Sequence, residues 1–154
     1  MKQTKKHIYK IIINFTENKI WTIFNAELEL YLNDELKWIK LNKLSIASFE
    51  NILVKIQDHY ENKIYYIFLK NANFIAEDNK IEIISSNEFN YYYKTNKQNK
   101  LSEKIKITKK ELSYFKTLNK IEIAIENIIK INELKTKLYT LEMIEKFSLS
   151  KWES

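Results

Sequence analysis

Residues 20–32 read IWTIFNAELELYL and carry the clearest secondary-structure signal in the chain. From Ala26 to Leu32, apolar residues alternate with Glu27, Glu29 and Tyr31. A period of two predicts a β-strand with one buried face and one exposed face. This stretch therefore predicts a sheet, and the other elements are assigned outward from it.

Segments on both sides of this strand predict further strands. Apolar runs rich in β-branched residues occupy residues 8–15, 63–70, 73–76 and 80–84, and a weaker run covers 35–44. Turns rich in Asn and Asp separate them, and Glu77-Asp78-Asn79 predicts a hairpin before the strand at 80–84. We therefore expect an antiparallel sheet of five to six strands.

Two regions have helical periodicity instead. Between residues 45 and 60, the apolar residues recur at steps of three and four, which predicts one inserted helix over residues 46–60. A second helical segment is predicted over 108–147, with capping-box spacing from Thr108 to Glu111 and a break near Asn119. The fold class is α+β: the sheet with its inserted helix, followed by a C-terminal helical segment.

The domain prediction is a single domain over residues 1–154. It consists of a strand-rich part at 7–84, a basic linker at 94–107 and the helical part at 108–147. No run approaches the roughly 20 apolar residues of a membrane span, and no signal peptide is evident. We expect a cytoplasmic protein that makes no membrane contact.

The composition excludes several kinds of site. The chain has no Cys, Gly or Pro, which excludes thiolate chemistry, disulfides and the glycine-rich phosphate loops. All 26 basic residues are Lys, and with the many Ile, Asn and Tyr residues this indicates an AT-rich genome. The lack of Gly also predicts that few positions require a positive φ angle.

The net charge of +6 is confined to one segment. Residues 1–93 and residues 111–154 each balance their lysines with carboxylates, so the excess lies in residues 94–110. Three tyrosines precede that segment directly. The candidate site for a partner or polyanion is Tyr91, Tyr92, Tyr93, Lys94, Lys97, Lys100, Lys104, Lys106, Lys109 and Lys110.

This segment has more than one interpretation. Aromatic rings beside lysines suit single-stranded nucleic acid, because bases stack on rings while ammonium groups neutralise phosphates. A polar, charged stretch between structured parts is also typical of a solvated loop. The absence of Arg argues against specific readout of bases or phosphates.

The chain shows no catalytic or metal-binding pattern. Asp58 and His59 are adjacent, and adjacent helical residues do not face each other. Glu77-Asp78-Asn79 is explained by its turn and supplies too few ligands for a hard cation. We therefore expect no enzyme activity, no cofactor and no metal.

One short segment occurs in two similar copies. Residues 17–24 read ENKIWTIF and residues 61–68 read ENKIYYIF. A duplicated turn-and-strand unit explains the similarity, and so does coincidence in a chain so rich in Lys, Asn and Ile.

The predicted function is a non-catalytic protein-interaction module. A small chain without motifs and of extreme composition is typical of inhibitors that mobile elements encode against bacterial defence nuclease complexes. The alternative is an RNA- or DNA-binding structural subunit of a ribonucleoprotein that uses the basic segment 94–110. The apolar C-terminal helix also predicts contact with a second copy or a partner, and so a homo-oligomer is one expectation.

Overall fold

The computed structural model describes residues 7–97 and 100–153, and the chain divides into two compact units. The barrel unit contains the residues up to Tyr93 and the segment from Lys151 onward. The hairpin unit is Lys94–Ser150. Residues 98 and 99 of the predicted basic linker lie outside the described residues. That the chain forms a single domain stays a prediction.

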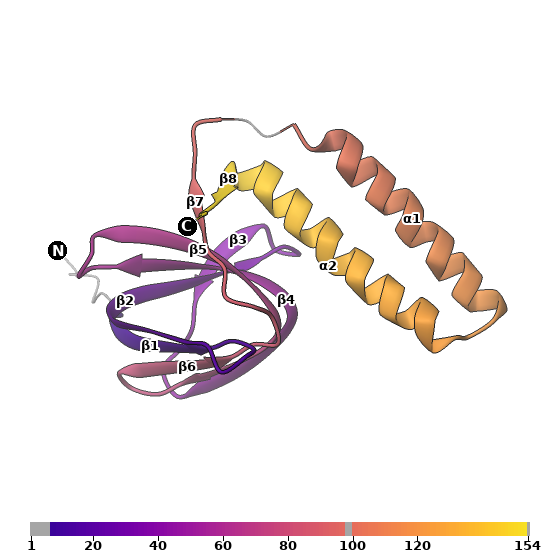
Figure 1. The fold of residues 1–154 in the computed structure, drawn as a ribbon. Coiled ribbons are helices and arrows are strands. Elements are labelled where there is room, and N and C mark those ends of the chain that lie inside the picture. The colour runs from indigo at the N-terminus through magenta and orange to yellow at the C-terminus, as the bar shows by residue number, and fades with distance from the viewer. Residues whose placement is uncertain (1–6, 98–99, 154) are drawn as a thin grey trace. The chain divides into compact units, whose positions relative to one another are not determined.

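Eight strands and two helices follow one another along the described residues (Figure 1). They are β1 Tyr9–Asn14, β2 Ile20–Leu32, β3 Lys37–Lys40, β4 Ser45–Asp58, β5 Lys63–Ala76, β6 Lys80–Ile84, β7 Tyr92–Lys94, α1 Ser102–Ile121, α2 Ile125–Phe147 and β8 Leu149–Lys151. The α+β class is confirmed, as are the strands predicted at 20–32 and 80–84. Neither helix in the described residues combines the length and the apolar character that crossing a membrane requires.

Five strands of the barrel unit close into a ring. β1 pairs with β2, β2 with β4, β4 with β5 and β5 with β6, each pair antiparallel. β6 then pairs with β1 in parallel, which places Lys10 opposite Lys80 and Asn14 opposite Ile84. Strand direction reverses at every antiparallel step, so the first and fifth strands of an odd-numbered ring must run the same way. The prediction of a wholly antiparallel sheet is therefore wrong at this β1–β6 seam.

The helix predicted over residues 46–60 is wrong, because residues 46–58 belong to β4 and residues 59 and 60 lie in the turn that follows it. The strand pairs with β5 along its whole length, from Ser45 opposite Ala76 to Asp58 opposite Lys63. Its buried face changes near the middle: Phe49 packs against the core from the first half, whereas Ile52 and Val54 are buried in the second. That step of three residues interrupts the period of two, and the result resembles helical spacing.

A paired bend explains the change of face. Asn71 in β5 lies beside this point and has a φ of 46°, a left-handed value that Asn adopts more easily than most residues. β5 changes its buried face at the same place, from Leu69 to Ala72. Both strands turn together, which curves the sheet around a core that β1, β2, β4, β5 and β6 all supply.

The hairpin unit consists mainly of α1 and α2, which run antiparallel (Figure 1). They pack through Leu112, Ile131 and Leu134, with Phe115 and Leu138 partly buried beside them. The predicted break is confirmed close to its expected place, because α1 ends at Ile121 and α2 begins at Ile125. The Asn119 side chain accepts a hydrogen bond from the Ala124 N–H at 3.4 Å, which stabilises the connection.

α1 begins at Ser102 rather than at residue 108, so the predicted capping box is wrong. Thr108 is 1% exposed, and its hydroxyl donates to the carbonyl of Lys104 at 2.7 Å within the helix. That bond is a known alternative to capping for Thr. The second part of the predicted basic linker is therefore helical.

Positive φ angles are more frequent than the absence of Gly predicts. Seven described residues have them: Glu17, Asn18, Leu36, Leu44, Asn62, Asn71 and Ser148. Asn supplies three, at positions where its short polar side chain lowers the cost of the left-handed conformation. Leu36 and Leu44 have no such advantage, and so their turns are strained.

Candidate functional site

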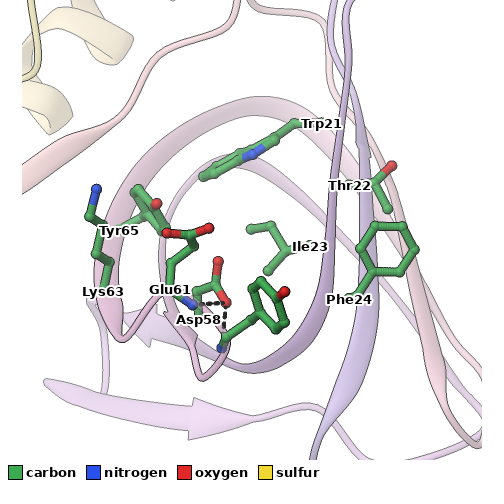
Figure 2. Close-up of a pocket in the computed structure, with 9 residues that line it drawn as sticks. Trp21, Thr22, Ile23, Phe24, Asp58, Glu61, Lys63 and Tyr65 are labelled. Carbon is green, nitrogen blue, oxygen red and sulfur yellow. Dashed lines mark hydrogen bonds between the residues drawn. The ribbon is translucent and has the colours of Figure 1, made fainter.

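The barrel unit has an open pocket beside the turn that joins β4 to β5, which we call the turn pocket (Figure 2). Its volume is about 550 Å³. The nine residues that line it are Trp21, Thr22, Ile23, Phe24, Asp58, Tyr60, Glu61, Lys63 and Tyr65. The pocket lies here because β2 pairs with β4 only from Ala26 onward, so the first residues of β2 run past the end of β4.

A β-bulge sets which residues of β2 face this pocket. The pairing of β1 with β2 shifts by one residue between Tyr9 opposite Ala26 and Ile11 opposite Ile23. An extra residue on one strand moves the inward face to the other set of side chains. Ile23 is consequently buried and Trp21 half-buried. Phe24, which follows Ile23 at the shift in pairing, is 72% exposed.

Aromatic rings form two sides of the pocket: in Figure 2, Trp21 lies at the top and Tyr65 on the left. The ring centroids of Trp21 and Tyr65 lie 4.9 Å apart, with their planes at 86°. Tyr91 packs against both rings, edge-on to Tyr65 at 5.1 Å and nearly parallel to Trp21 at 6.1 Å. Such contacts hold the rings in place while leaving Trp21 and Tyr65 partly accessible.

The last described residues of the chain extend this cluster. Trp152 stacks on Tyr91 at 4.9 Å with a 21° angle between the planes. The Trp152 N–H donates to the carbonyl oxygen of Tyr91 at 3.0 Å. Trp21, Tyr91 and Trp152 therefore form a row of nearly parallel rings within the barrel unit.

Asp58 shapes the floor of the pocket. The residue is only 7% exposed, and its Oδ1 accepts hydrogen bonds from the N–H groups of Tyr60 at 2.9 Å and Glu61 at 3.2 Å. These bonds fix a turn of the kind that Asp favours. Asn62, with a φ of 54°, completes the return into β5.

The two carboxylates of the pocket give it a negative potential. In Figure 2 the carboxyl groups of Asp58 and Glu61 both point into the space below Trp21 and beside Tyr65. Burial raises the pKa of the Tyr65 phenol, and the nearby carboxylates of Asp58 and Glu61 raise that pKa further. The field of the carboxylates thus reaches the aromatic wall.

The structure divides the predicted site residues between the two units. Tyr91, Tyr92 and Tyr93 belong to the barrel unit, and all seven lysines belong to the hairpin unit. Tyr91 joins the aromatic cluster, and Tyr92 packs edge-on against Phe68 at 5.0 Å. Tyr93 is 46% exposed.

The seven lysines are all exposed. Lys94, Lys97 and Lys100 precede α1, and Lys104, Lys106, Lys109 and Lys110 lie within it. At 100° per residue, Lys106, Lys109 and Lys110 share one half of the helix circumference, and Lys104 lies on the other half. Lys109 also pairs with Glu142 of α2 at 3.7 Å. The lysines therefore form a dispersed basic surface rather than one compact patch.

His59, which follows Asp58 in sequence, contacts the carboxylate of Glu27. His59 Nε2 lies 2.8 Å from Glu27 Oε2, and Lys40 Nζ lies 3.6 Å from Glu27 Oε1. Neither contact involves Asp58, so these contacts do not pair His59 with the adjacent carboxylate. Among the described residues, no group of three or more His, Asp and Glu residues is placed to hold a metal ion.

The sequence does not predict the turn pocket, because the helical spacing of residues 46–60 places Asp58 near the end of a helix rather than at the end of β4. The repeated segment held the missing signal. Asn18 and Asn62 occupy the same position in the two copies, and both have positive φ, 58° and 54°. Trp21 and Tyr65 are also equivalent, and their rings are in contact.

Comparisons with known proteins identify two matching regions. The model described as the UU051 N-terminal domain matches residues 10–90, and the model described as the C-terminal domain of uncharacterised protein UU051 matches residues 102–152. Uncharacterized protein UU051 of Ureaplasma parvum serovar 3 is 27% identical over 153 residues, which cover 96% of this chain and 90% of that protein. Every residue that lines the turn pocket lies within the first match.

Proposed function

The chain belongs to the UU051 family, and from that premise we propose that it is a non-catalytic protein-interaction module whose turn pocket receives a side chain of a partner protein. One observation carries the proposal. The pocket of about 550 Å³ joins accessible Trp and Tyr rings to a small number of fixed polar groups. Pockets of this composition are typical of binding sites.

Aromatic residues make the proposal specific to a protein partner. Trp and Tyr are enriched among the few residues that supply most of the binding energy at protein interfaces, because their rings bury much apolar area with little loss of conformational freedom. Tyr60 is 84% exposed and Phe24 is 72% exposed, both at the mouth of the pocket. Rings so exposed on a folded barrel are available for contact.

The charge of the pocket favours protein over nucleic acid at this site. Asp58 and Glu61 carry two negative charges there against the single positive charge of Lys63. A phosphate backbone would be repelled, since nucleic-acid sites neutralise phosphates with lysine and arginine. The narrower proposal is that the chain inhibits a bacterial defence nuclease complex. Identifying the partner protein tests that proposal.

The test begins with capture from host lysate on the tagged full-length protein, with and without nuclease. The captured partner is then purified and its affinity measured by calorimetry for the wild type, Tyr60→Ala and Phe24→Ala. We expect each substitution to weaken binding at least fivefold, because each removes an exposed ring at the pocket. Ile46→Ala is the matched control, since Ile46 is 78% exposed in β4 and does not line the pocket. Equal affinities for all four proteins would refute the pocket as the contact.

A second candidate function rests on the exposed lysines of α1. Lys104, Lys106, Lys109 and Lys110 are suited to binding nucleic acid through phosphates. Replacing all four with Gln is expected to reduce the slope of log K against log salt by about one unit for each phosphate that the protein no longer neutralises. If the slope is unchanged, or if a protein partner is still captured after nuclease treatment, the nucleic-acid function is rejected and the protein-interaction proposal remains.

A further inference from the structure

We infer that the turn pocket recognises a cationic side chain, the guanidinium of arginine or the ammonium of lysine, presented by the partner. The inference rests on the proposed function and names the chemistry of the group that enters the pocket. It is carried by two features that meet there: a pair of perpendicular aromatic walls and a pair of carboxylates.

The aromatic walls suit a cation. Trp21 and Tyr65 stand at 86° with their centroids 4.9 Å apart, so the planes of the two rings form a corner at the pocket. The faces of Trp and Tyr attract cations through the ring quadrupole, and Trp attracts them most strongly. The barrel unit already contains this contact elsewhere, with Lys19 Nζ 4.9 Å from the centre of the Phe89 ring.

Lys63 also lines the pocket, but neither the Asp58 nor the Glu61 carboxylate forms an ion pair in the part of the chain that the structure describes. Asp58 is 7% exposed, and the turn N–H groups bond to its Oδ1. These hydrogen bonds compensate the buried carboxylate in part, and a cation bound in the pocket supplies the opposite charge that they do not.

The position of Asp58 is also rigid. Two backbone N–H groups hold one of its oxygens, and its backbone pairs with Lys63 at the end of the ladder between β4 and β5. A fixed charge loses little entropy when a ligand binds, which raises affinity for a correctly shaped cation. Glu61 is exposed and follows in the same turn, so it supplies a second carboxylate at the mouth.

The test uses single amino-acid derivatives and the full-length protein. N-acetyl-arginine amide, N-acetyl-lysine amide and N-acetyl-citrulline amide are titrated separately, and the indole N–H resonance of Trp21 is followed by NMR. That resonance is assigned by its loss in Trp21→Phe. Citrulline has the shape of arginine without its charge. We expect saturable shifts with arginine or lysine, and the ratio of their affinities identifies the preferred cation, while citrulline produces at least tenfold weaker binding.

Variants separate charge from structure. Asp58→Asn keeps an oxygen that can accept the turn hydrogen bonds, and Glu61→Gln keeps the size of the side chain. The double variant is expected to bind the preferred cation at least tenfold more weakly. Glu88→Gln removes one charge from an exposed residue that does not line the pocket, and its binding is expected to remain within twofold of the wild type.

The outcomes distinguish this inference from the proposed function. Equal binding of citrulline and arginine, no binding of either cation, or wild-type affinity in the double variant would overturn the cation inference. If the captured partner still loses affinity with Tyr60→Ala in that case, the interaction module stands and a neutral side chain enters the pocket. If Tyr60→Ala and Phe24→Ala also leave partner binding unchanged, both proposals fall.

Discussion

Isoleucines that face the interior of the barrel unit are fully buried, whereas those at the end of the helical hairpin are exposed. In the barrel, Ile11, Ile13 and Ile83 are 0% exposed, whereas at the end of the helical hairpin Ile121 is 81% and Ile123 79% exposed. A closed sheet surrounds its interior with side chains from every strand, but two helices share only one seam. Closure of the sheet therefore provides an enclosed interior for apolar side chains that a pair of helices does not.

The largest effect is expected from the barrel core, through Phe74→Ala. Phe74 is 0% exposed and packs edge-on against Phe49 at 5.8 Å. Removing the ring should lower the free energy of unfolding by about 3–5 kcal/mol, because a closed barrel cannot collapse onto the cavity. Urea denaturation followed by circular dichroism measures it, with Ile46→Ala as the exposed control. A loss below about 1 kcal/mol would mean that the core is loosely packed.

A smaller effect is expected in the hairpin unit from Leu134→Ala. Leu134 is 3% exposed in a cluster with Leu112 and Ile131. The loss should be about 2–3 kcal/mol, at the low end for a buried leucine, because so small a cluster relaxes more easily. Urea denaturation monitored by the helical circular dichroism signal reports the hairpin. Ile129→Ala is the control on the same helix, since Ile129 is 53% exposed; equal losses for the two variants would contradict the assigned core.

At the bend in β5, two substitutions of Asn71 separate the contribution of its side chain from that of its backbone conformation. Asn71→Ala should cost about 1–2 kcal/mol, because its φ of 46° is unfavourable for a residue with a Cβ that lacks the polar group of Asn. Asn71→Gly accepts this φ freely and should be nearly neutral. Both variants remove the Asn71 hydrogen bond to Ser86 at 3.4 Å, so their difference in unfolding free energy isolates the backbone. Identical values would show that φ is not the cause.

The smallest effect on stability is expected at the end of the hairpin, from Ile123→Ser. The side chain is 79% exposed, so the free energy of unfolding should change by less than about 0.5 kcal/mol. Self-association, if it uses these isoleucines, should weaken measurably in analytical ultracentrifugation. A dimer that survives both Ile123→Ser and Ile121→Ser would place the predicted homo-oligomer contact elsewhere.

Strands with a regular alternation were predictable, and strands that change face were not. Residues 26–32 alternate without interruption, and β2 has the predicted bounds. The prediction for β4 was wrong because Phe49 and Ile52, three positions apart, face the same core. They lie on the two sides of a bend that depends on pairing with β5. Local periodicity contains no information about a partner strand, so the helix was the simpler interpretation.

The candidate site was predictable only in part for a similar reason. Tyr91 was singled out for its neighbouring lysines, yet it contacts Trp21 and Tyr65, which are distant in sequence. The lysines themselves are placed in the other unit. Asp58 acquires its role from a turn whose existence depends on β4 being a strand. The repeated segment is the one sequence feature that links Trp21 to Tyr65, and a match at six of eight positions in so biased a composition is too weak to interpret.

The β1–β6 seam also has a consequence for the order of folding. It joins residues 10–14 to residues 80–84, and pairing over so long a separation slows folding, because the entropy of closing the loop is lost before contacts compensate it. During synthesis at about 5–20 residues per second, β1 emerges roughly 4–14 s before β6. Until β6 emerges, the ladder with β2 is the one ladder of β1 that can form. Closing the seam joins the ring strands that lie farthest apart in sequence, and we expect this step to limit the rate of barrel formation.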